Sequence, residues 1–268
     1  MGMFCYQCEQ TAKGTGCTVR GVCGKEPEVS GLMDLLLEAT KGIAKYAHRA
    51  GLLGKRCNEV DVFVIQALFA TVTNVDFDSA RLRDLIAEAA AVKMNARNLY
   101  ESVAGAAAQT LSGPTKWEVS SATDPEEFGV LNRRAKLGED LSGLQELVLY
   151  GLKGAAAYAD HARVLGKESD EVYALFMEAL DYLSQESPDL NTLLGWALKT
   201  GELNLKVMEL LDAGNTQTYG HPVPTPVRIT PIRGKCILVS GHDLKDLYNL
   251  LKQTENTGIN VYTHGEML

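Results

Sequence analysis

The sequence lacks the features by which membrane, secreted and nucleic-acid-binding proteins are usually recognised. No apolar run approaches the roughly 18 residues that a membrane-spanning helix requires, and no charged and apolar leader follows Met1. Lysine and arginine form no basic stripe, and the formal net charge is −8, so electrostatics would repel nucleic acid. We therefore expect a cytoplasmic protein without nucleic-acid or membrane partners.

Cysteine is scarce along most of the chain, yet four of the six cysteines lie close to its start. Cys5, Cys8, Cys17 and Cys23 form the pattern C-x2-C-x8-C-x5-C, interrupted by Gly14, Gly16, Gly21 and Gly24. A chain of this length buries roughly three quarters of its unfolded surface, so it does not need disulfides to replace a core. A tight cysteine pair followed by two cysteines on flexible loops is typical of thiolates around one compact metal centre.

An iron-sulfur cluster is the favoured occupant of this centre. Zinc is the main alternative, because four cysteines also satisfy a tetrahedral zinc ion. Structural zinc sites usually repeat the C-x2-C unit, and here only the first pair has it. A third interpretation, in which the helices that follow form an interaction scaffold and the cysteines bind nothing, does not account for their spacing.

A duplication occupies the middle of the chain. Residues 31–55 (GLMDLLLEATKGIAKYAHRAGLLGK) align with residues 143–167 (GLQELVLYGLKGAAAYADHARVLGK) at a shift of 112 positions. The recurring residues are Leu32, Leu35, Leu37, Lys41, Gly42, Ala44, Tyr46, Ala47, Ala50, Leu53, Gly54 and Lys55. Their three- and four-residue steps predict one amphipathic helix used twice, and each copy ends in Leu-Gly-Lys, where glycine terminates the helix.

Two further apolar segments follow each copy, at residues 60–75 and 79–103 after the first and at 171–184 and 190–211 after the second. The pattern predicts two three-helix bundles. His48 and His161 occupy nonmatching positions of the two copies, so we expect each to be a packing or surface histidine.

Changes in composition divide the chain. Gly113-Pro114 and Asp124-Pro125 mark a connector, and four of the eight prolines fall between residues 222 and 231, where they exclude regular helix. We predict a cysteine-rich cluster-binding segment at 1–30, a first bundle at 31–111, a connector at 112–140, a second bundle at 141–214, a proline-rich linker at 215–234, and a truncated α/β domain at 235–268.

The last segment has the pattern of one βαβ unit. Cys236–Ser240 indicates a buried strand, Leu244–Thr254 an amphipathic helix capped by Asp243, and residues 259–263 a second strand. The fold expected is therefore mainly α, with two duplicated bundles followed by the start of a Rossmann-like α/β domain. Ligands of such sheets bind beyond the carboxyl ends of the strands, where His242, His264 and Glu266 follow. These side chains are candidates for a second site, although His242 could instead belong to a tight turn.

The sequence resembles the hybrid cluster protein family, also called prismane proteins or hydroxylamine reductases, along its entire length. The resemblance is carried by the cysteine spacing and by three stretches, Met3-Phe4-Cys5-Tyr6-Gln7-Cys8-Glu9-Gln10-Thr11, Ser240-Gly241-His242-Asp243 and His264-Gly265-Glu266-Met267. It implies that Cys5, Cys8, Cys17 and Cys23 bind a 4Fe-4S cubane. It also implies that His242 and Glu266 bind iron of a hybrid iron-sulfur-oxygen cluster, with catalytic roles there.

By this resemblance the protein is an oxidoreductase that reduces hydroxylamine to ammonia or nitric oxide to nitrous oxide. Electrons would come from an external donor protein through the cubane, and a small nitrogen-oxide substrate would react at the hybrid cluster.

Members of the family have roughly twice this length and complete the hybrid cluster with later cysteines. The remaining cysteines here, Cys57 and Cys236, do not match those positions, and we expect both to be small buried residues. We therefore interpret the chain as the amino-terminal half of a member, either truncated, proteolysed or part of a split protein that needs its missing carboxyl-terminal half. Alone, it would be a 4Fe-4S electron-transfer or scaffold fragment with an incomplete hybrid cluster.

Overall fold

The computed structural model describes residues 2–118 and 124–267, and within them it contains eight α-helices and two β-strands. The expected fold class, mainly α with a small α/β element, is confirmed. The chain divides into two compact units. The first comprises Met1–Asp160 and Ser169–Met208, and the second comprises His161–Glu168 and Glu209–Leu268. None of the described helices is long and apolar enough to cross a membrane.

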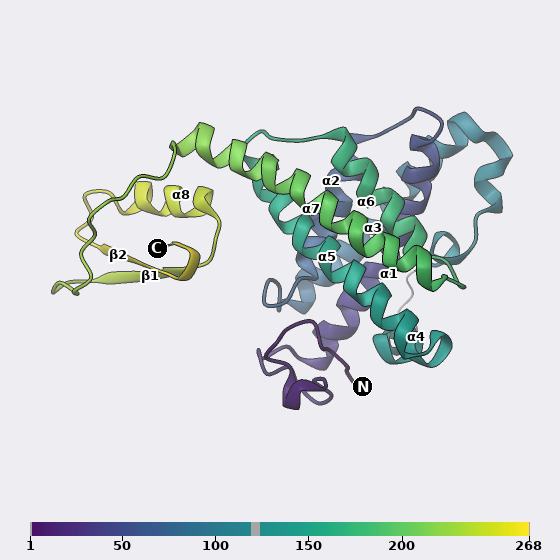
Figure 1. Ribbon diagram of the computed structural model, residues 1–268, viewed down its shortest axis with the longest axis horizontal. Coiled ribbons are helices and arrows are strands. Elements are labelled where there is room, and N and C mark those ends of the chain that lie inside the picture. The colour runs from purple at the N-terminus through teal and green to yellow at the C-terminus, as the bar shows by residue number, and fades with distance from the viewer. Residues whose placement is uncertain (1, 119–123, 268) are drawn as a thin grey trace. The chain divides into compact units, whose positions relative to one another are not determined.

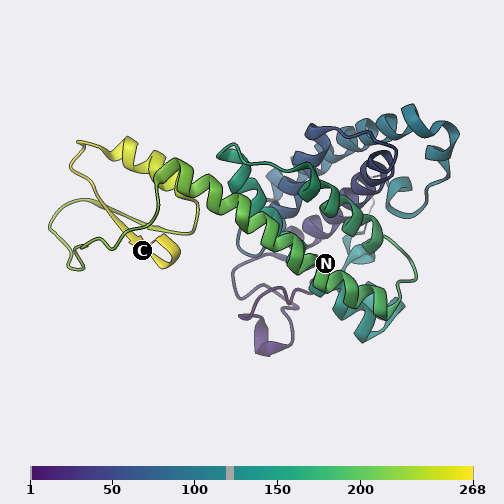
Figure 2. The same ribbon diagram turned by 45° about the horizontal axis from the view of Figure 1, so that its top comes forward.

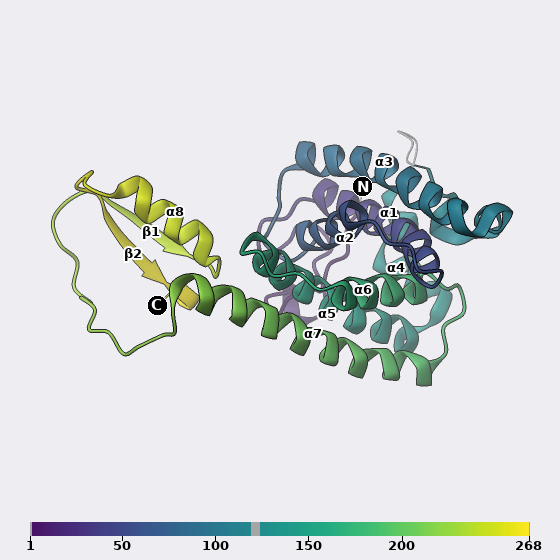
Figure 3. The same ribbon diagram turned by 90° about the horizontal axis from the view of Figure 1, so that it is seen from above.

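Three helices form the first copy of the repeat: α1 (Pro27–Gly51), α2 (Asn58–Ala70) and α3 (Ser79–Ala104). Proline at the first position of α1 fits the fixed backbone angle of a helix start, and Asp78 caps α3 by accepting hydrogen bonds from the amides of Ala80 and Arg81. α1 packs against both α2 and α3 and against α6 (Asp170–Leu183) of the second copy. Figure 3 shows α1 between α3 and α6.

The second copy reproduces the first with the predicted shift. It consists of α5 (Glu139–Val164), α6 and α7 (Leu190–Tyr219), and α1, α2 and α3 moved by 112 residues would begin at 139, 170 and 191 (Figure 1). The glycines predicted to end the repeated helices, Gly54 and Gly166, both adopt a left-handed φ of 77°. The duplication is therefore structural and extends across all three helices.

Polar contacts to one buried carboxylate join the two copies. The carboxylate of Asp181 on α6, whose side chain is 4% exposed, lies 2.7 Å from His48 Nδ1 and 2.9 Å from Arg49 Nε at the end of α1. His48 is thus a packing histidine with a specific partner. Because the three groups come from both copies, they fix the register of α1 on α6.

Short helices make up the connector between the copies. They are η2 (Gly105–Thr110), η3 (Gly113–Lys116), η4 (Pro125–Phe128) and the eight-residue α4 (Val130–Leu137). η3 approaches α1 so closely that a Cβ on Gly42 would lie 2.6 Å from the carbonyl oxygen of Pro114. In the first copy, the close packing of η3 against α1 therefore explains why this repeated position is glycine.

The second unit contains the predicted βαβ element. β1 (Cys236–Ser240) and β2 (Asn260–His264) pair in parallel, α8 (Leu244–Thr254) connects them, and η5 (Gly265–Met267) follows. The expectation that β1 is buried is wrong, since its residues are exposed or half-buried and Leu238 is 71% exposed. One partner strand and one helix leave much of this short sheet uncovered.

Candidate metal centre

Backbone pairing brings two of the four predicted cysteine ligands together. Cys5 and Cys17 form an isolated antiparallel bridge, with reciprocal N–H to carbonyl hydrogen bonds of 3.1 and 2.8 Å. Directly opposed residues in such a pair carry their side chains on the same face, with Cβ atoms about 5 Å apart. Backbone pairing at these two cysteines therefore fixes part of the cysteine segment, which is the irregular purple stretch in Figures 1 and 2.

The sulfur of Cys17 has polar neighbours that favour the thiolate. The amide of Ala12 donates to Sγ at 3.4 Å, and the Thr11 hydroxyl lies 3.7 Å away. Hydrogen bonds from the backbone amides of Ala12 and Val22 hold the pKa of the Cys17 thiol below its ordinary value. Since the thiolate is the form that binds metal, this environment suits a ligand.

Tight turns carry the other cysteines. Cys8 begins a turn closed by a hydrogen bond from the Thr11 amide, and Cys23 lies in a turn where Gly21 N–H donates to the Lys25 carbonyl at 2.8 Å. A Cβ on Gly21 would lie 3.0 Å from both Cys23 Sγ and Lys25 Cβ, so the close approach of these atoms favours glycine in this turn. All four thiols are free, with Cys17 buried, Cys5 and Cys8 half-buried and Cys23 exposed.

Aromatic side chains flanking Cys5 attach the segment to the helices. The Arg134 guanidinium lies 5.5 Å from the ring centroid of Phe4 and 5.9 Å from that of Tyr6. The Tyr6 ring also meets Tyr150 of α5 edge-on, with centroids 6.0 Å apart. The residues before and after Cys5 in the sequence, Phe4 and Tyr6, therefore both contact side chains of the helical part and attach the cysteine segment to it.

Buried charges lie directly under the cysteine segment. A small cavity is lined by Cys5 together with Lys25, Asp34, Arg133, Glu146 and Lys153. Arg133 Nε donates to Glu146 Oε1 at 3.0 Å, and their side chains are 17% and 4% exposed. Burial alone would raise the pKa of Glu146, but Arg133 and hydrogen bonds from Tyr150 and Arg133 hold it below its ordinary value.

The duplication generates part of this charged cluster. Asp34 and Lys41 of α1 correspond, at a shift of 112, to Glu146 and Lys153 of α5. Burial raises the pKa of Asp34 to about 6 and lowers that of Lys153 to about 8, although neighbouring opposite charges resist both shifts. Sequence reasoning recorded the recurrence of Lys41 but did not recognise the repeated acid seven residues before it.

The described residues hold no group of three or more His, Cys, Asp or Glu side chains arranged to bind a single metal ion. Thiolates around a core of several irons stand farther apart than those around one ion. The assignment of the four cysteines to an iron-sulfur cluster therefore stays a prediction.

The carboxyl ends of β1 and β2 adjoin, as the sequence predicted for a second site. Ser240 pairs with His264 in the strand register, and the Ser240 hydroxyl lies 3.2 Å from His264 Nδ1. The roles predicted for His242, which follows β1, and for Glu266, which lies in η5, stay predictions. The side chain of Glu266 is outside the described part of the chain.

His161 contributes to the surroundings of His242, which sequence reasoning missed. Its ring meets the His242 ring at a centroid distance of 4.9 Å, and its Nδ1 lies 3.2 Å from Asp243 Oδ2. The other oxygen of Asp243 accepts hydrogen bonds from the amides of Lys245 and Asp246, which confirms its predicted role as the α8 cap. No periodic signal links residue 161 with residue 242, so only the folded chain reveals this contact.

The remaining cysteines depart from expectation. Cys57 is half-buried at the start of α2, and its thiol donates to Glu59 Oε2 at 3.0 Å. Cys236 is exposed at the start of β1. The prediction that both are buried is wrong, because both lie at element ends that other parts of the described chain do not cover.

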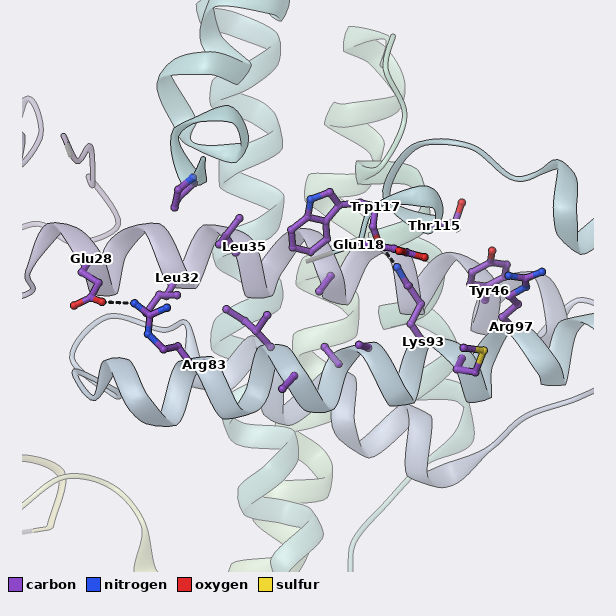
Figure 4. A pocket seen from close by; sticks show the side chains of 17 residues that line it. Glu28, Leu32, Leu35, Tyr46, Arg83, Lys93, Arg97, Thr115, Trp117 and Glu118 are labelled. Atoms are coloured by element: carbon purple, nitrogen blue, oxygen red, sulfur yellow. Dashed lines mark hydrogen bonds and ion pairs between the residues drawn. The ribbon is translucent and has the colours of Figure 1, made fainter. Parts of the chain in front are cut away.

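A larger groove of about 810 Å³ lies between α1 and α3 (Figure 4). Its charged groups are used within the protein: Arg83 pairs with Glu28, and Lys93 donates to the carbonyl of Trp117. Larger apolar and aromatic side chains, such as Leu35, Tyr46 and Trp117, line most of the rest, together with several alanines. The described residues that line the groove include no cysteine or histidine, so they do not provide the donor set of a metal centre.

Comparison with known proteins places these features in a family context. A model of the Prismane/CO dehydrogenase family matches residues 3–268. Proteins named hydroxylamine reductase from Rhodospirillum rubrum, Syntrophobacter fumaroxidans and Geobacter sulfurreducens are 48%, 49% and 45% identical over 274, 271 and 280 aligned residues. These matches cover 99%, 99% and 100% of the chain but 50% of each relative, so the chain spans half the length of these relatives.

Proposed function

Because this chain belongs to the Prismane/CO dehydrogenase family, we propose that it is the electron-transfer half of an iron-sulfur oxidoreductase that reduces hydroxylamine. The names of its relatives support the reaction. The observation that carries the proposal is the pairing of Cys5 with Cys17 above a buried cluster of charged side chains.

The described residues fit an anionic iron-sulfur core. All four thiols are free, with Cys5 and Cys17 on paired backbone and Cys8 and Cys23 in turns. One sulfur already accepts a backbone hydrogen bond, and buried cations line the adjoining cavity. A thiolate-ligated cluster supplies one-electron transfer with a potential set by burial, hydrogen bonds and nearby charge. The protein's part is to hold the thiolates, exclude water through Phe4 and Tyr6, and supply compensating charge through Arg133 and Lys153.

We propose that a second centre forms beyond β1 and β2. His242 and Glu266 would bind iron of a hybrid iron-sulfur-oxygen cluster there, and His161 and Asp243 would orient the His242 ring. Nitrogen and carboxylate ligands are harder than thiolates and suit a centre that binds an N–O group. The reaction consumes two electrons and two protons per hydroxylamine and gives ammonia and water. We propose the reduction of nitric oxide to nitrous oxide as a second activity of the same centre.

The partners follow from this division of roles. An external donor protein would supply electrons to the cysteine-bound cluster, and the remaining ligands of the second centre would come from a segment equivalent to the other half of the relatives. Alone, the 268-residue chain would bind the first cluster and transfer electrons without reducing hydroxylamine.

The test uses a full-length protein that contains this sequence and has been purified without oxygen. Hydroxylamine-dependent oxidation of a reduced dye should proceed, and Glu266→Gln should abolish it while leaving the spectrum of the cysteine-bound cluster unchanged. Undiminished turnover in the Glu266→Gln protein would contradict the assignment of the second centre. A wild-type protein without any hydroxylamine reduction would contradict the proposed reaction.

A further inference from the structure

Lys25 is buried beside the predicted cysteine ligands. It is 1% exposed, is among the largest fully buried side chains described, and follows Cys23 by two residues. It lines the same small cavity as Cys5, together with Phe4 and Gln7 from the cysteine segment. Its charge also favours the thiolate of Cys17 and acts on Asp34. The ammonium group is therefore enclosed between the cysteines and the helices beneath them.

Within residues 2–118 and 124–267, no hydrogen bond or ion pair is found for this ammonium group. The other buried cations have protein partners: Arg133 bonds to Glu146, Lys153 donates to the Thr71 carbonyl at 3.4 Å, and Lys41 lies 3.7 Å from Glu38. An ammonium group has three N–H donors, which the side chain of a buried lysine directs to protein, ligand or water acceptors. Lys25 thus has unused donors at the place where the chain presents its thiols.

We propose that Lys25 faces the iron-sulfur core bound by Cys5, Cys8, Cys17 and Cys23, and that its ammonium donates hydrogen bonds to the sulfurs of that core. This inference rests on the proposed function. The positive charge offsets the negative charge of a thiolate-ligated cluster, which increases further when one electron is added. Lys25 is accordingly a positioning residue that makes the cluster easier to reduce and strengthens its retention.

Lys41 provides a matched control. It is also a buried lysine, 6% exposed on α1, but it does not line the cavity that contains Cys5. Lys41→Met removes the same charge from the same unit and, like Lys25→Met, keeps an apolar stem of similar length. If removing a buried charge affected only folding, Lys41→Met and Lys25→Met should have the same effect on iron retention and reduction potential.

The experiment compares wild type, Lys25→Met, Lys25→Arg and Lys41→Met after anaerobic reconstitution of the 268-residue chain with ferrous iron and sulfide. Iron and sulfide are counted, and one-electron reduction by dithionite is followed by EPR against solution potential. In Lys25→Met the equilibrium constant for reduction should fall at least tenfold, which is about 59 mV toward more negative potential. Lys25→Arg and Lys41→Met should stay within about threefold of wild type, or roughly 30 mV.

If Lys25→Met fails to retain iron, the comparison with Lys25→Arg decides. Retention in Lys25→Arg supports a required positive charge, whereas loss of iron from both variants, or an unchanged potential in a loaded Lys25→Met chain, overturns the inference. A wild-type chain that binds zinc or no metal contradicts the proposed function itself, so the two failures are distinguishable.

Discussion

Replacing Glu146 by Gln should destabilise the first unit strongly, because it removes the partner of a buried cation. The Arg133 and Glu146 side chains are 17% and 4% exposed, and Arg133 Nε lies 3.0 Å from Glu146 Oε1. Breaking a buried pair by removing one member typically costs about 3–5 kcal/mol, since the other charge stays uncompensated. We expect a loss of this size in the free energy of unfolding of the apo chain.

A double-mutant cycle measures the coupling directly. Arg133→Met should also destabilise the chain, but Arg133→Met combined with Glu146→Gln should cost less than the sum by about 2 kcal/mol. Urea unfolding followed by helical circular dichroism gives the four free energies. As a control, Lys199 and Glu178 form a pair at 2.8 Å whose side chains are 38% and 39% exposed, and Lys199→Met should cost no more than about 1 kcal/mol. Additivity at 133 and 146 within about 0.5 kcal/mol would refute the reasoning.

Three further predictions test individual residues. Burial raises the pKa of Asp34 to about 6, above the roughly 3.9 of an unfolded chain, so this group should lower stability by up to about 3 kcal/mol as pH rises from 4 to 6. Burial also raises the pKa of Asp61 to about 6, so Asp34→Asn should remove only the Asp34 share of the fall in urea titrations, and a fall as large as that of wild type would contradict the reasoning. Gly42→Ala should destabilise the protein by about 1–3 kcal/mol, because the new Cβ would lie 2.6 Å from the Pro114 carbonyl oxygen. Gly154→Ala, at the equivalent position of the second copy where a Cβ meets no atom within 4 Å, should stabilise it by up to about 1 kcal/mol. Equal shifts of the melting temperature in the two variants would argue against the close approach. Asp243→Ala should weaken α8 by about 1 kcal/mol, seen as faster hydrogen exchange of its first-turn amides, and unchanged exchange would exclude a capping role.

The duplication made most of the helical fold predictable. Repeated residues such as Tyr46 and Tyr158 fixed the shift of 112, and glycines at equivalent positions marked both helix ends. Parallel pairing of the last two strands followed from the short helix between them. These features depend on local pattern, which a sequence carries directly.

The surroundings of the candidate centres depend on contacts between distant residues. The approach of His161 to His242 joins positions 81 residues apart, and the enclosure of Lys25 depends on side chains from α1 and α5. The exposure of Cys236 was missed for a related reason, because an apolar strand pattern does not state how many neighbours cover it. Local pattern thus leads to a prediction of ligand types, whereas the charged side chains around the cysteines are known only from the packing of the folded chain.

The central claim, that the four amino-terminal cysteines together hold one iron-sulfur core, is tested most directly by metal and sulfide analysis of the anaerobically reconstituted chain. Wild type and a Cys57→Ser control should each bind about four irons and four sulfides per chain, and Cys17→Ser should lose most of both. One zinc per chain, or iron binding that is unaffected by Cys17→Ser, would contradict the account.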